Sequence, residues 1–321
     1  MRRELSPVSE AGDGIAGLHS MIMCRPNLFL IGAMKSGTTY LNKLLGAHPS
    51  IFMCRPEEPS YFVDPSQLEQ LWPYMWDQGF WRSREHYLRL FESAGDAPIV
   101  GEASTNYTKL PLVSGVPEKI REFNPNAHFI YIMRDPTERT ISHYWHMVRY
   151  NAEYRPILSA IQADAQFLDV SHYAMQLEPY FDYFGADRVC TLTYEQMVHN
   201  PVETMRRLFR WLGLDASLAG ETLFDEPENV TPGVVSGATS FGLLQKLRQR
   251  RPFRAITPHV PLPIRRLARR LTTRDICRQS VDTLEVLRFL RPIQRTQTEE
   301  LARLLGREFP EWTTLYGDCR Q

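Results

Sequence analysis

Lys35, Ser36, Gly37, Thr38 and Thr39 follow one another in the chain and combine a cation, a glycine and three hydroxyl groups. The apolar run 28–32 just before them predicts a buried strand, and the residues after them predict a helix packed on a sheet. Such a junction directs several backbone N–H groups and the positive end of a helix dipole to one point. The segment is therefore a candidate site for a phosphate or a sulfate.

The order of these residues differs from that of the usual NTPase loop. There the lysine follows the second glycine and a hydroxyl after it holds Mg²⁺, whereas here Lys35 precedes Gly37. An ordinary strand-to-helix connector without a ligand is the alternative. A second anion site would decide between the two interpretations.

A second strand-to-helix junction occurs about a hundred residues later. The run 128–133 predicts another buried strand, and Arg134 follows it immediately. Asp135 is suited to the N-cap of a helix, Pro136 to its first position and Glu138 to a capping box. The sequence thus predicts an arginine held at the carboxyl end of a strand, beside the start of a helix.

Ser142 and His146 lie four residues apart and share one face of this second helix, with Arg139 three residues before Ser142. Arginine and a hydroxyl in this arrangement suit a bidentate clamp for a phosphate. Taken singly, Arg134 could pair with a surface carboxylate, Ser142 could bond to its own helix, and His146 could be a half-buried histidine. The recurrence of the same strand-then-helix context favours two anion sites.

The two motifs resemble those of the sulfotransferases that use 3′-phosphoadenosine 5′-phosphosulfate (PAPS). The first matches their 5′-phosphosulfate loop and the second matches their 3′-phosphate site. The stretches 192–195, 200–213 and 301–308 are similar to the group related to heparan sulfate sulfotransferases, so the resemblance covers residues 26–316.

The resemblance implies that the 5′-phosphosulfate is held by Lys35, Ser36, Gly37, Thr38 and Thr39. It implies that Arg134 and Ser142 hold the 3′-phosphate and that the product is adenosine 3′,5′-bisphosphate. Sulfuryl transfer to a hydroxyl needs a cation for the leaving phosphate, for which Lys35 is the candidate. The family uses no metal, and no His, Cys or carboxylate cluster here has the spacing of metal ligands.

The transfer also needs a base for the acceptor proton. The segment 55–62 carries two adjacent carboxylates before a proline and two aromatic residues. The resemblance implies that Glu58 is the base, since its register matches a Glu-x-x-aromatic-Phe element, and Glu57 is the second choice. A turn with two exposed acids is the alternative. His146 matches a position at which some members carry a histidine that assists proton transfer.

Two stretches depart from the family pattern. In 101–107, Thr105 and Asn106 replace the residues around the proline of an acceptor-side motif, Glu-x-Ser/Thr-Pro-x-Tyr. The stretch 229–239 corresponds to a cofactor-covering loop that is basic in heparan-type members, but it has no basic residue before Lys246. Backbone N–H groups could substitute for that basic loop, or Lys246 and Arg248 could fold back.

The 321 residues are ample for one α/β domain with a large core. Strand-like runs alternate with helical or loop segments, which predicts a P-loop-like, three-layer fold with a central, mostly parallel sheet flanked by helices. We expect a flexible leader over residues 1–25 and a single sulfotransferase domain over residues 26–316.

The net charge is zero, but residues 246–278 hold eleven Lys and Arg against one Asp. This segment is either a solvated basic face or a contact for an acidic acceptor, an acyl-carrier partner or an anionic membrane surface, and nucleic acid is disfavoured. The aromatic stretch 61–91 is either core or an acceptor-binding wall. Five cysteines without paired spacing and no apolar span or signal core predict a bacterial, cytoplasmic protein.

The sequence therefore predicts a PAPS-dependent sulfotransferase that modifies a hydroxyl of a glycan, lipid, carrier-bound or small-molecule acceptor. A P-loop nucleotide kinase is one alternative and would need an acidic residue after a neighbouring strand to hold Mg²⁺, where Arg134 stands instead. A non-catalytic nucleotide-binding module is the other. The acceptor and the oligomeric state stay open.

Overall fold

Five parallel strands form the central sheet. A computed structural model of the chain describes residues 24–150, 153–220, 234–238, 273–277 and 282–317. The strands run in the order β2-β3-β1-β4-β5, and each neighbouring pair is parallel. Their bounds are β1 (Leu28–Gly32), β2 (Ile51–Met53), β3 (Ile99–Ala103), β4 (His128–Met133) and β5 (Val189–Thr193). The predicted parallel sheet and the strands predicted over 28–32 and 128–133 are confirmed.

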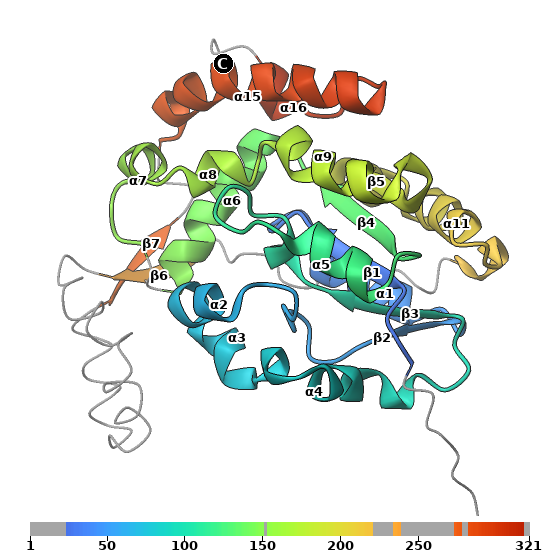
Figure 1. Cartoon of the computed structure of the whole chain (residues 1–321). Coiled ribbons are helices and arrows are strands. Elements are labelled where there is room, and N and C mark those ends of the chain that lie inside the picture. The colour runs from blue at the N-terminus through green and yellow to red at the C-terminus, as the bar shows by residue number, and fades with distance from the viewer. Residues whose placement is uncertain (1–23, 151–152, 221–233, 239–272, 278–281, 318–321) are drawn as a thin grey trace, which may run out of the picture.

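Helices cover both faces of this sheet (Figure 1). Their bounds are α1 (Thr38–Gly46), α2 (Pro65–Leu71), α3 (Pro73–Gln78), α4 (Arg84–Leu88), α5 (Val116–Phe123), α6 (Pro136–Arg149), α7 (Ile157–Ala163), α8 (Gln166–Asp169), α9 (Tyr173–Phe184), α10 (Tyr194–His199), α11 (Pro201–Trp211), α15 (Leu284–Leu305) and α16 (Thr313–Tyr316). Short 3₁₀ turns, among them η3 (Thr105–Tyr107), complete the connections.

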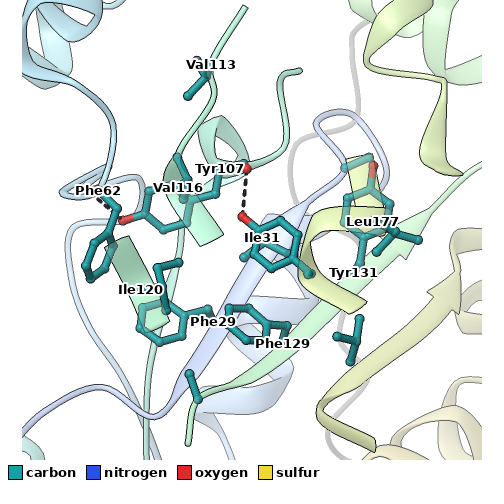
Figure 2. Packing of buried hydrophobic residues seen from close by; sticks show 14 of the residues in the cluster. Phe29, Ile31, Phe62, Tyr107, Val113, Val116, Ile120, Phe129, Tyr131 and Leu177 are labelled. Atoms are coloured by element: carbon teal, nitrogen blue, oxygen red, sulfur yellow. Dashed lines mark hydrogen bonds between the residues drawn. The ribbon is translucent and has the colours of Figure 1, made fainter. Parts of the chain in front are cut away.

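Alternate residues of the central strands enter two separate cores, because successive side chains of a strand point to opposite faces. Leu28 and Leu30 of β1 pack with the apolar residues of α1 and α11. Phe29 of β1 stacks on Phe129 of β4, with ring centroids 5.7 Å apart, in the other core (Figure 2). Burial on both faces explains why these strands read as continuous apolar runs.

The start of α6 follows the sequence prediction in part. Asp135 is the N-cap, and its carboxylate accepts hydrogen bonds from the backbone N–H groups of Thr137 and Glu138. The predicted capping box is wrong, because the N–H of Asp135 donates to Glu195 of α10 at 2.9 Å rather than to Glu138. A carboxylate from a distant helix has replaced the local partner.

The aromatic stretch 61–91 is partly core. Phe62, Tyr87 and Phe91 are buried, and Tyr61 stacks on Tyr87 at 4.1 Å. Tyr74 of α3, by contrast, is 73% exposed. Phe62, Tyr87 and Phe91 are therefore ordinary core residues. For the other aromatic residues of this stretch, the acceptor-binding wall stays a prediction.

A two-stranded antiparallel sheet, β6 (Val234–Ala238) with β7 (Thr273–Cys277), lies beside α6. Most of the predicted covering loop and of the basic segment 246–278 lies outside the described residues. In the part of the chain that the structure describes, no helix is long and apolar enough to cross a membrane.

Candidate active site

The glycine loop leaves the carboxyl end of β1 and leads into α1. Gly37 is the residue before the helix, with φ at +91°, and no side chain caps the first N–H groups of α1. Ser36 is fully buried, yet its hydroxyl has no hydrogen-bond partner among the described residues. A buried polar atom normally has a partner, so the loop fits an anion that would accept from this hydroxyl and from the helix N-terminus.

Tyr194, the first residue of α10, connects the loop to the second anion motif. A Cβ atom added to Gly37 would lie 2.9 Å from the Tyr194 ring, so the ring packs directly against the loop. The guanidinium of Arg134 lies over the same ring, 5.1 Å from its centroid. The two predicted anion sites therefore both lie against one aromatic side chain.

Arg134 follows β4 at the carboxyl end of the sheet and pairs with Glu138 one turn along α6, at 3.2 Å. Its side chain stays partly exposed, so an anion can reach it. Arg139 is fully buried and bonds to the Ser171 hydroxyl and the Phe167 carbonyl, which makes it part of the interior of this layer. Ser142 is buried on α6, 7% exposed.

His146 lies close to the glycine loop. Burial lowers its pKa to about 4, and the positive charges of Lys35 and Lys109 act in the same direction. The imidazole is therefore neutral near pH 7. Its ring is tilted against that of Tyr150, with centroids 4.7 Å apart. The structure brings Lys35 and His146 into one electrostatic neighbourhood from different elements.

The adjacent carboxylates of Glu57 and Glu58 have different surroundings. Glu57 accepts hydrogen bonds from the Thr39 hydroxyl at 3.1 Å and the Asn42 amide at 2.9 Å, and so is tied to the first turns of α1. It lines a groove of about 740 Å³ between α1 and the edge strand β2, together with Lys43 and Arg55. Glu57 thus supports the helix that carries the glycine loop.

Glu58 is held at the end of β3. Its N–H donates to the Ala103 carbonyl at 2.8 Å, and Thr105 donates to its carboxylate from the backbone N–H at 2.9 Å and from the hydroxyl at 2.8 Å. Burial raises the pKa of Glu58, while the Thr105 hydrogen bonds and the charge of Lys109 oppose the rise. A fixed carboxylate with a raised pKa is suited to accept a proton.

Comparisons with known proteins agree with this geometry. Residues 26–217 match the model of a family described as the Sulfotransferase family. The chain belongs to this family. A human heparan sulfate glucosamine 3-O-sulfotransferase 5 is 22% identical over 219 residues, which are 64% of this chain and 59% of that protein. A membrane-associated sulfotransferase of Dictyostelium discoideum is 30% identical over 132 residues, 40% of this chain and 24% of that protein. The chain thus spans less than two thirds of the length of these curated relatives.

A solved sulfotransferase from Alicyclobacillus acidocaldarius has the same fold. It superposes with a TM-score of 0.63 at 22% sequence identity, covering 90% of this chain and 99% of that chain. The predicted three-layer fold with a parallel sheet is therefore shared with this solved sulfotransferase.

Thr105, which stands where the family pattern has a proline, makes hydrogen bonds that a proline could not make. A proline at this position has no N–H group and could not donate to Glu58, whereas Thr105 donates twice. Next to it, the fully buried Glu102 accepts from the hydroxyls of Tyr87, Tyr107 and Ser104, and Ser104 in turn accepts from the N–H of Ser60. This hydrogen-bonded group fixes the loop that carries Glu58.

Sequence reasoning missed Lys109 and the role of Thr105. Neither lies in a repeated spacing or beside a helix start, and the only signal was the altered motif at 101–107. The residues that the structure describes contain no group of three His, Cys, Asp or Glu side chains that could hold a metal ion.

Proposed function

We propose that this protein transfers a sulfuryl group from PAPS to a hydroxyl of an acceptor. The observation that carries the proposal is that the glycine loop with Lys35 and the guanidinium of Arg134 lie at the carboxyl ends of the adjacent strands β1 and β4, both against Tyr194. A ligand with two separate phosphate-type groups fits two such sites, and ligands of parallel sheets bind at this edge.

The glycine loop would hold the 5′-phosphosulfate through Lys35, the Ser36 hydroxyl and the N–H groups of Gly37, Thr38 and Thr39. Arg134 and Ser142 would hold the 3′-phosphate. PAPS supplies an activated sulfuryl group with a phosphate as the leaving group, so Lys35 serves to stabilise the negative charge that develops on that phosphate.

Glu58 is the proposed base that takes the acceptor proton. Its carboxylate is fixed by Thr105 and carries a raised pKa, which brings it closer to the working pH of a base. His146, whose pKa is lowered to about 4, is neutral and so able to orient the acceptor hydroxyl as a hydrogen-bond partner.

The acceptor is proposed only as a hydroxyl-bearing molecule. The human relative's name specifies a glucosamine 3-O position of heparan sulfate, and a glycan is one proposal for this chain on that basis. A lipid, carrier-bound or small-molecule acceptor stays equally open. The bacterial cytoplasm stays a prediction for its location.

Calorimetric titration with adenosine 3′,5′-bisphosphate (PAP) tests the donor assignment. We expect tight binding that does not depend on added metal, and weak or no binding of ATP with Mg²⁺. A preference for ATP with Mg²⁺ would support the nucleotide kinase in its place. Normal turnover of PAPS by a Glu58→Gln variant would shift the role of base to Glu57 or His146.

A further inference from the structure

Lys109 is a buried cation that forms no ion pair with the residues that the structure describes. It follows η3 and is 4% exposed. Its ammonium lies 3.2 Å from the sulfur of Met34 and 5.2 Å from the ring centroid of Trp72. Within the described ranges it donates to no oxygen and forms no ion pair. A lysine is rarely buried without an anionic partner, because its desolvated charge is costly.

Lys109 lies among the groups assigned to the transfer site. Met34 directly precedes Lys35 in the glycine loop, so the ammonium touches that loop. Its charge also acts on Glu58, and on His143 and His146 of α6, two histidines that Lys35 affects as well.

The charged and titratable groups that act on Lys109 or share its surroundings come from the glycine loop, from α6 and from the segment that carries Glu58. They are Glu58, Lys35, Arg139, His143 and His146. Both histidines have lowered pKa values, first because they are buried and then because of the surrounding cations. The region is therefore rich in positive charge, with Glu58 as the carboxylate that acts on Lys109.

A structural ion pair with Glu58 does not explain this lysine. Both carboxylate oxygens of Glu58 accept from Thr105, and the described residues show no bond between Glu58 and Lys109. The two charges interact without a hydrogen bond between them, so Glu58 does not use the N–H groups of the Lys109 ammonium. A buried charge in this state is stabilised when an anion enters the site.

We infer that Lys109 is a second cation of the transfer site and donates a hydrogen bond to the sulfonate oxygens of the bound donor. This rests on the proposed function. In the step itself the acceptor oxygen forms a bond to sulfur as the bond from sulfur to the 5′-phosphate oxygen breaks. The acceptor proton passes to Glu58, the electron pair leaves with the phosphate, and Lys109 keeps its proton.

The test compares PAPS with PAP, which lacks the sulfonate, in calorimetric titrations of the full chain. Lys109→Met keeps the length of the side chain and its contacts with Met34 and Trp72 but removes the charge. The control is Lys119→Met, which removes an exposed lysine whose ammonium donates to the Phe62 carbonyl. We expect Lys109→Met to weaken PAPS by about 10- to 100-fold, as for a lost charge-assisted hydrogen bond, and PAP by less than about threefold.

The outcomes separate the inference from the proposed function. Equal weakening of PAPS and PAP would place the ammonium on the phosphate and overturn the sulfonate contact. Unchanged affinity for both would overturn any donor contact. Retained PAP binding shows that the variant is folded. Failure of the wild-type protein to bind PAP would refute the proposed function itself, before any variant is considered.

Proton uptake gives a second measurement that does not depend on activity. Burial lowers the pKa of Lys109 to about 8, so about half of these amines are neutral at pH 8. An anion that contacts the ammonium raises this pKa, and binding of PAPS at pH 8 should then take up about half a proton. Titrations in buffers of different ionisation enthalpy measure the uptake. It should vanish in Lys109→Met and at pH 6.5, and its persistence in the variant would contradict the inference.

Discussion

Thr105 donates two hydrogen bonds to the Glu58 carboxylate, one from its backbone N–H at 2.9 Å and one from its hydroxyl at 2.8 Å. One residue thus fixes the position of the proposed base. The backbone N–H survives any side-chain substitution except proline, while the hydroxyl can be removed separately. The function of Glu58 can therefore be tested by substituting Glu58 itself and by removing only the Thr105 hydroxyl that bonds to it.

Glu58→Gln should lower the release of PAP from PAPS by about 10²- to 10⁴-fold, because general base catalysis is lost while the shape of the side chain is kept. PAP affinity should stay within about threefold, since the phosphates bind elsewhere. Thr105→Val, which keeps the N–H but loses the hydroxyl, should lower the rate by a smaller factor. A Gln variant with normal turnover would show that another group takes the proton.

The pH dependence of the rate should follow the raised pKa of Glu58. A base must be unprotonated, so the rate should fall as the pH falls through this pKa. The fall should begin at a higher pH than for an ordinary glutamate. Rates measured between pH 5 and 9 check this, and the fall of the rate at low pH should disappear in Glu58→Gln. If the rate of that variant falls at low pH in the same way, the titrating group is not Glu58.

Arg134→Ala should weaken PAP by about 100-fold, as expected for a lost bidentate contact with a phosphate. Adenosine 5′-monophosphate, which has no 3′-phosphate, should bind the variant and the wild type almost equally. Arg210→Ala is the control, because Arg210 is an exposed arginine of α11 paired with Glu203. An equal loss for both nucleotides would mean that Arg134 does not contact the 3′-phosphate.

Ser36→Ala should stabilise the unliganded protein by about 1 kcal/mol, because the buried hydroxyl has no partner among the described residues. The same change should weaken PAP, since the hydroxyl is then missing from the anion site. Thermal melting with and without PAP measures both effects. Ser171→Ala should instead destabilise, because that hydroxyl bonds to Arg139 and to the Pro136 carbonyl. Loss of stability in Ser36→Ala would indicate a structural role.

Gly37→Ala should destabilise the protein by about 1–3 kcal/mol and abolish PAP binding. Its φ of +91° disfavours any side chain, and the new Cβ would meet the Tyr194 ring at 2.9 Å. Gly46→Ala, in the last turn of α1, is the matched control, since its Cβ would lie at an ordinary 3.6 Å from Met53. Urea unfolding and calorimetry compare the two, and equal effects would contradict the account.

Glu102 should make stability depend on pH. Burial raises its pKa from 4.5 to about 7, so the folded protein holds this proton more tightly than the unfolded chain. The free energy of unfolding should therefore fall as the pH rises from about 4.5 to about 7, by at most about 3 kcal/mol. Urea unfolding at several pH values in this range should show that the free energy of unfolding changes less with pH in Glu102→Gln. An unchanged dependence on pH would mean that Glu102 does not titrate in this range.

Much of the fold could be predicted because its signals are local. The strands and the two strand-to-helix junctions follow from apolar runs bounded by glycine, or by Asp135 and Pro136. The capping-box prediction failed because the fold brings Glu195, sixty residues away, close to the start of α6, where it accepts from the N–H of Asp135. A local pattern cannot reveal a competitor that only the fold brings near.

Candidate site residues could be predicted where they are contiguous in the sequence. They could not be predicted where only the fold brings them together. Lys35 and Arg134 stand directly after predicted strands, so their place at one edge of the sheet could be anticipated. Lys109 and Tyr194 reach the site through packing of η3 and α10, and no spacing in the sequence links them to it. The distinction between Glu57 and Glu58 likewise needed their partners, Thr39 and Thr105.

A crystal structure of the complex with PAP would show where each phosphate binds. We expect the 5′-phosphate within hydrogen-bond distance of the Ser36 hydroxyl and the N–H groups that begin α1. We expect the 3′-phosphate on the Arg134 guanidinium and the Ser142 hydroxyl, with the Tyr194 ring close to both phosphates. A nucleotide bound in the opposite direction, or with either phosphate away from these residues, would contradict the assignment of a PAPS-dependent sulfotransferase.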